Sequence, residues 1–130
     1  MSKANDLHEL AGLTVTVDNV IHQPGAQAPP GMPHCFAYFI SIRNRSTVAV
    51  TIKGRKWVVR NFEGETTVLE GDGVVGQFPL IEPGGKFSYN SYHAFATKSA
   101  VAEGSYLGVT EDGRKVFTRI PRFEMLVPVA

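Results

Sequence analysis

The chain has little of three things: cysteine, long apolar runs and an excess of charge of one sign. Its one cysteine, Cys35, cannot form an internal disulfide, which favours a reducing compartment and predicts a cytoplasmic protein. No apolar run approaches the roughly 20 residues of a spanning helix, so we expect no membrane insertion. Lys and Arg number 13 against 12 Asp and Glu, whereas nucleic-acid binders more often have a clear basic excess. No nucleic-acid partner is therefore expected.

Length and composition indicate one globular domain over residues 1–130. The hydrophobic content is 43% and the charged content 19%, both ordinary for a folded domain. Residues 1–10 lack the apolar stretch of a signal peptide. We expect residues 1–11 to form a poorly ordered tail.

Helical periodicity is nearly absent, while alternating apolar and polar residues recur between turn signals. Only residues 97–103 could hold a helical turn. About seven to nine short strands of this kind are typical of a β-sandwich or barrel. The expected strands are 12–17, 35–44, 48–60, 65–70, 86–95, 103–110, 114–120 and 123–127.

The third expected strand changes phase at Gly54, because Val50 and Ile52 share one parity and Trp57 and Val59 share the other. A β-bulge adds one residue and moves every later side chain to the opposite face, so we predict a bulge there.

Charge is segregated between this strand and the next. Residues 43–60 contain six basic side chains and no acid, whereas residues 61–85 contain five acids and no base. A hairpin with a turn at 61–64 would make these charges cross-strand partners. It would set Arg55 opposite Glu70, and we expect this pair to be partly buried and to anchor the loop that follows.

That loop, Gly71 to Gly76, has the G-x-G-x-x-G spacing of a dinucleotide-binding fingerprint. The fingerprint needs a helix after the last glycine, and the proline three residues later leaves no room for one. Three interpretations remain open. The glycines can serve a tight turn, their N–H groups can bind an anion such as phosphate or pyrophosphate, or the loop can contact a protein through Val74 and Val75.

Catalytic and metal-binding patterns are missing. The sequence has no G-x-S-x-G, H-E-x-x-H or Walker lysine motif, and we name no catalytic residue. The four histidines are scattered, so no metal ligand is assigned. A loose carboxylate site for Mg²⁺ would have to draw on two turns, at Glu63 and Glu65 and at Glu111 and Asp112, and ligand spacing gives no support for bound Mg²⁺ or Co²⁺.

From Phe36 onward the chain resembles the bacterial ApaG family, whose domain also occurs in some F-box proteins and in a polymerase-delta-interacting protein. The match runs in unbroken order to Phe123. It rests on Phe36-Ala37-Tyr38, Ile40, Ile42, Asn44, Arg55, Trp57, Glu70 to Gly76, Pro79-Leu80, Pro83-Gly84, Phe87, Tyr89, Ser91, Glu103-Gly104-Ser105-Tyr106, Ile120-Pro121 and Phe123.

The resemblance implies an all-β fold, an immunoglobulin- or fibronectin type III-like sandwich, and a link to cobalt and magnesium efflux. Two departures weaken any ligand role taken from the family. Lys56 stands where the family usually has histidine, and residues 92–95 and 98–102 differ from the family's usual loop.

We therefore expect a non-enzymatic binding module with an unidentified protein partner and no cofactor, which can also form a homodimer. The alternative is a small-ligand sensor that holds phosphate, pyrophosphate or a divalent metal at the glycine loop. The residues expected to bind are Gly71, Asp72, Gly73, Val74, Val75, Gly76, Arg55 and Lys56, and those expected to be structural are Trp57 and Glu70.

Overall fold

The computed structural model describes residues 7–25 and 29–129, and this part of the chain is built from nine strands. No helix within it is long and apolar enough to cross a membrane. The strands are β1 (Leu7–Glu9), β2 (Leu13–His22), β3 (His34–Asn44), β4 (Val50–Asn61), β5 (Thr66–Asp72), β6 (Leu80–Ile81), β7 (Lys86–Phe95), β8 (Ser99–Thr110) and β9 (Lys115–Leu126).

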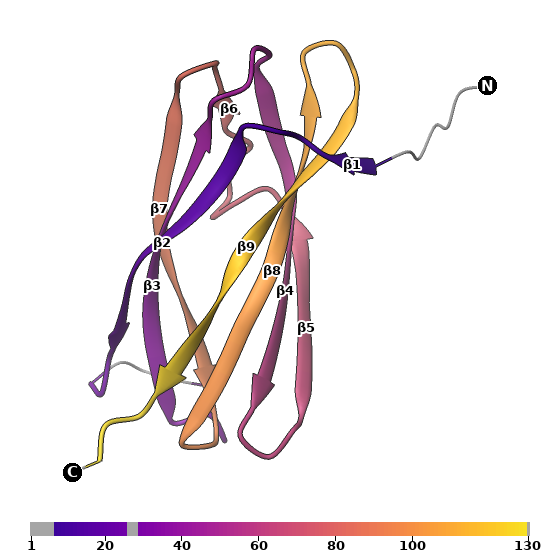
Figure 1. Cartoon of the computed structure of the whole chain (residues 1–130). Helices are drawn as coiled ribbons and strands as arrows, with labels where there is room; N and C mark the ends of the chain where they lie inside the picture. Colours follow the sequence, from indigo (N-terminus) through magenta and orange to yellow (C-terminus); the bar gives the residue numbers. More distant parts are fainter. Residues whose placement is uncertain (1–6, 26–28, 130) are drawn as a thin grey trace.

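The strands form two sheets that pack face to face (Figure 1). The larger sheet has the order β1-β9-β8-β4-β5, and β6 also pairs with β4. The smaller sheet has the order β2-β3-β7. All neighbours are antiparallel except β1 and β9, which run parallel. The expected all-β sandwich is confirmed.

The core lies between the two sheets because each strand turns every second side chain inward. On β3 these are Phe36, Tyr38, Ile40 and Ile42, each at most 4% exposed. Trp57 on β4 lies opposite them, with its ring centroid 4.9 Å from that of Tyr38. Aromatic rings therefore join the two layers near the middle of the sandwich.

The phase change of β4 is the predicted bulge. The register between β4 and β8 shifts between Ile52 and Gly54, so Lys53 is the extra residue. Ile52 precedes the shift and Trp57 follows it, and both are buried. The bulge lets one strand keep its apolar residues inward on both sides of Gly54.

Two expectations about local structure were wrong. Residues 97–103 form no helical turn, because β8 begins at Ser99 and pairs with both β4 and β9. Residues 7–11 are not a loose tail, since β1 pairs with β9 and Leu10 is buried. Leu10 N–H also donates to the carbonyl of Phe117. The rest of the expected tail, residues 1–6, lies outside the described residues.

Candidate functional site

The hairpin of β4 and β5 has a shorter turn than predicted. Asn61 N–H donates to the Glu65 carbonyl at 2.9 Å, and the Asn61 side-chain oxygen accepts the N–H groups of Glu63 and Glu65 at 3.0 Å. Asn61 thus closes the turn and belongs to the strand rather than to the turn. Every cross-strand pair is consequently one residue away from the predicted register.

The expected pair of Arg55 and Glu70 does not form. Arg55 lies opposite Gly71, and Lys56 lies opposite Glu70. The Arg55 guanidinium instead lies over the backbone of Gly71, where an added Cβ would stand 2.7 Å from Nη2. Its Nη1 donates to the carbonyls of Asp72 at 2.8 Å and Gly73 at 3.1 Å. Arg55 does anchor the loop, but through backbone carbonyls rather than through a carboxylate.

The glycine hairpin, Gly71 to Gln77, ends in a tight two-residue turn. Val74 N–H donates to the Gln77 carbonyl at 2.8 Å, and Gln77 N–H donates back to Val74 at 2.9 Å. The two residues between them have positive φ angles, 44° at Val75 and 79° at Gly76, as a type I′ turn requires. Position 73 also requires glycine, because the Cβ of any other residue there would lie 2.3 Å from the Gln77 carbonyl oxygen.

The two valines of the hairpin have opposite environments. Val74 is fully buried at 0% exposure, so the expectation that it contacts a partner was wrong. The turn reverses the chain and directs this side chain into the core. Val75 is 48% exposed and Phe78, just after the hairpin, is 55% exposed. These two side chains remain available to a partner.

Three N–H groups of the hairpin are already bonded to backbone carbonyls. Gly73 N–H donates to the Lys53 carbonyl at 2.8 Å, and those of Val74 and Gln77 close the turn. An anion nest needs successive N–H groups that converge on an unfilled concavity. This geometry favours the structural interpretation of the glycines over the phosphate interpretation.

β5 is an edge strand that is exposed on both faces. No other strand in the described part of the chain pairs with its outer side, and every residue from Thr66 to Glu70 is exposed. Val68 is 52% and Leu69 46% exposed, although consecutive side chains point to opposite faces. β5 is the last strand at one end of the larger sheet, next to β4 (Figure 1).

The hydrogen-bond pattern identifies which backbone groups of β5 face outward. Asn61 bonds Glu65 and Lys53 bonds Gly73, and bonded pairs alternate along an antiparallel ladder. The pairs that include Thr66, Val68 and Glu70 therefore lie between the bonded ones. These three residues direct their N–H and C=O groups away from β4, which leaves a row of backbone groups without a partner strand.

Among the described residues, no acidic side chain at this edge makes an ion pair. Within residues 7–25 and 29–129, the ion pairs are Arg114 with Asp112 and Arg119 with Glu9. The predicted cross-strand pairing of β4 bases with β5 acids is thus not made, although Lys56 lies opposite Glu70. The acids left in and beside β5 are Glu63, Glu65, Glu70 and Asp72.

A buried aromatic cluster that includes His93 lies between the two sheets. Its ring stacks on Tyr38 at 4.7 Å and meets Trp57 edge-on at 4.6 Å. His93 Nε2 and Trp57 Nε1 are buried without a hydrogen-bond partner among the described residues. Burial lowers the pKa of His93 from 6.5 to about 4. No role was predicted for His93 from the sequence, although its position on the strand has the same parity as those of the inward-facing residues Phe87, Tyr89 and Phe95.

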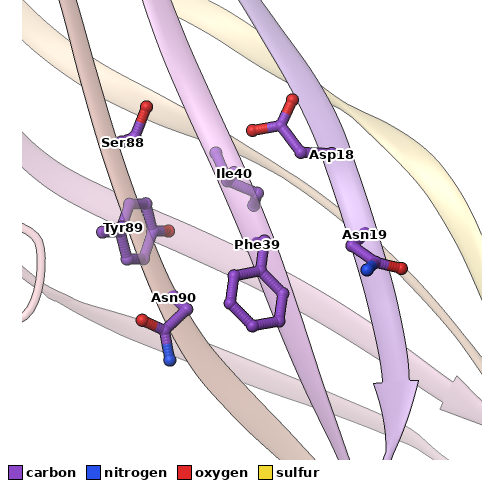
Figure 2. Close-up of a pocket in the computed structure, with 7 residues that line it drawn as sticks. All are labelled: Asp18, Asn19, Phe39, Ile40, Ser88, Tyr89 and Asn90. Carbon is purple, nitrogen blue, oxygen red and sulfur yellow. The ribbon is translucent and has the colours of Figure 1, made fainter.

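A second surface feature is a hollow of about 520 Å³ on the outer face of the smaller sheet. Figure 2 shows Phe39 at its centre, with Asn19 on one side and Asn90 on the other. At one end the Ser41 hydroxyl donates to Asp18 at 2.5 Å, and this bond is the main cause that lowers the Asp18 pKa. The charged group of the hollow is therefore already engaged within the sheet.

No metal centre forms among the residues that the structure describes, where no three His, Cys, Asp or Glu side chains come together. The two turns considered for Mg²⁺ lie at opposite ends of β4. Asn61, next to the first turn, pairs with Ala100, and Val50, at the other end, pairs with Thr110 next to the second. Twelve residues of strand separate them, about 40 Å at some 3.3 Å per residue.

Comparison with known proteins places the chain in a family. The ApaG domain matches residues 24–110. Protein ApaG of Thiobacillus denitrificans is 41% identical over 100 residues, which cover 77% of this chain and 79% of that protein. Protein ApaG of Pseudomonas entomophila is 39% identical over 95 residues, covering 73% and 75%. These names state no enzymatic activity.

Two solved structures share the fold. The crystal structure of an ApaA protein from Bordetella pertussis has a TM-score of 0.80 and 31% identity, and the match covers 91% of this chain and 95% of that one. The X-ray structure of a structural-genomics target has a TM-score of 0.81 and 28% identity, covering 90% and 88%. The chain belongs to the ApaG domain family.

Proposed function

We propose that this ApaG-domain chain is a non-enzymatic binding module that engages another protein through β5. The partner adds an extended segment to the free edge of the larger sheet, a mode of recognition in which main-chain hydrogen bonds give affinity and side chains give selectivity. Exposed Val75 and Phe78 of the neighbouring loop add apolar contacts.

The observation that carries this proposal is that β5 is exposed and that its outward backbone groups have no partner strand among the described residues. Edge strands in soluble proteins are usually kept short, bulged, covered, or protected by proline or by charged side chains, especially lysine. β5 has seven residues in a regular register with β4 and contains neither lysine nor proline. Its outward N–H and C=O groups are therefore accessible to a second strand.

The hairpin beyond β5 supports the proposal by its rigidity. Arg55 binds two of its carbonyls and the Val74–Gln77 bridge closes its tip. A partner would meet a surface that is already ordered, which lowers the entropic cost of association. The link to cobalt and magnesium efflux implied by the family resemblance would then be an effect of the partner that β5 recruits.

Site-specific photo-crosslinking tests the proposal. A photoreactive amino acid is placed at position 68 on β5 and, as a control, at position 124 on β9, an exposed site of the same sheet. Irradiation of cells that produce the chain is expected to give discrete protein adducts from position 68 that are absent from position 124. Equal adducts from both positions, or none from β5, would refute a binding role for this edge.

A further inference from the structure

We propose that the strand accepted by β5 is a basic one, with lysine or arginine alternating with apolar or β-branched residues. This inference rests on the proposed function, because it names the chemistry of the partner at the same edge. It identifies the class of segment that fits: extended, positively charged and without proline at the positions that donate to β5.

Charge complementarity is the first argument. Residues 61–85 contain five acidic and no basic side chains, and none of these acids makes an ion pair among the described residues. A partner that carries bases would neutralise them, and complementary charge raises the rate and the specificity of association.

The same charges argue against a second copy of this chain as the occupant. Pairing of two β5 strands would bring together two edges that each carry Glu65, Glu70 and Asp72. Like charges on adjacent strands are destabilising. The acids thus act against self-association while they leave the edge open to a basic segment.

The register gives the order of residue types in the partner. Val68 and Glu70 have side chains on the outer face, with those of Lys56 and Val58, and Leu69 lies on the face of Trp57. In an antiparallel addition, a base therefore lies opposite Glu70, an apolar residue beside Leu69 and a β-branched residue opposite Val68. Read in its own direction, the partner has a base followed by two apolar residues.

β7 also has a free edge and is the main competitor within the fold. Its sheet order is β2-β3-β7, so nothing in the described chain pairs with its outer side. Its inward residues His93 and Phe95 are buried, and Tyr92 is its one exposed large apolar side chain. β7 contains Lys86 and no acid, so a basic segment distinguishes the two edges.

Two synthetic peptides test the inference on the full chain by amide NMR. The basic probe is Lys-Thr-Arg-Ile-Val-Thr-Thr, and the matched acidic probe replaces both bases by glutamate. We expect the basic peptide alone to shift the amide signals of Thr66, Val68 and Glu70, and added salt to weaken the effect.

Charge reversal on the protein supplies the matched variants. Glu70→Lys should lower the affinity for the basic peptide roughly fivefold, since it replaces a cross-strand attraction by a repulsion. The same substitution should raise the affinity for the acidic peptide. Glu124→Lys changes the net charge equally but lies at an exposed position of β9, away from β5, so it should leave both affinities within about twofold. Val68→Pro removes an outward N–H and should abolish binding while retaining native amide dispersion.

Several results would overturn the inference, and they separate it from the proposed function. Equal binding of both peptides at β5 would show that this edge accepts an extended segment but does not select basic ones. Shifts of β7 signals without shifts of β5 signals would show that a basic segment binds the smaller sheet instead. Concentration-dependent shifts of β5 without peptide would make a second copy the occupant. If neither peptide perturbs β5, the basic-strand inference fails, while crosslinking at position 68 still decides the proposed function independently.

Discussion

His93→Phe should remove most of the acid sensitivity of this fold. The His93 side chain is 4% exposed, between Tyr38 and Trp57, and burial lowers its pKa from 6.5 to about 4. In the unfolded chain the imidazole titrates near its ordinary value of about 6.5. Between these two values the unfolded chain binds one more proton than the folded chain. The free energy of unfolding therefore falls as the pH is lowered through this window.

The size of the effect follows from the two pKa values. One pKa unit corresponds to about 1.36 kcal/mol, so the wild-type chain should lose about 2 kcal/mol by pH 5 and about 3 kcal/mol by pH 4. This stability is fully present above pH 6.5. The lowered pKa values of Asp18 and Asp112 act below their ordinary value of 3.8 and do not overlap this window.

Urea denaturation at pH 7 and pH 5 measures the difference, and fluorescence of Trp57, the only tryptophan, reports unfolding. His93→Phe can change the absolute stability through packing, so the quantity compared is the loss between the two pH values. We expect this loss to be about 2 kcal/mol smaller in the variant. A variant with the same pH dependence as the wild type, or an NMR titration of folded His93 with a midpoint near 6.5, would refute the reasoning.

Three further predictions concern the glycines and the turn. Val75→Asn should stabilise the fold by about 1 kcal/mol, because valine is strained at φ 44° and asparagine tolerates that region; an unchanged denaturation midpoint would contradict it. Gly104→Ala should destabilise by about 2 kcal/mol or more in the same assay, since its Cβ would stand 2.1 Å from the Lys56 carbonyl oxygen. Gly25→Ala, with open space around it, is the control. Pyrophosphate should leave the amide signals of the glycine hairpin unshifted, because Gly73 N–H is already bonded, and saturable shifts at sub-millimolar ligand would contradict this.

The sandwich was predictable because strand periodicity is local and strong. The expected strand at 86–95 has the bounds of β7, and the bulge at Gly54 followed from a change of parity alone. The hairpin register was not predictable to one residue, because it depends on the Asn61 side chain, which caps the turn. That single residue decides whether Arg55 faces a carboxylate or a glycine.

The candidate site was only partly predictable from sequence. Arg55 was identified as an anchor of the glycine hairpin, but its partners are backbone carbonyls, which no sequence pattern reveals. Val74 was misassigned because alternation cannot be extended through a turn with two positive φ angles. The pairing of β1 was missed because a three-residue strand gives almost no periodic signal.

The order of strands in the two sheets has a consequence for synthesis on the ribosome. β4 obtains its second long neighbour only when β8 has been made, and β3 obtains its second neighbour only with β7. A nascent chain that ends before Ser99 can form the β2–β3 and β4–β5 hairpins but cannot close the larger sheet over them. Isolated hairpins are at best marginally stable in water. Like charges on the acidic residues of β5 would then also oppose pairing between nascent chains that are translated from the same mRNA.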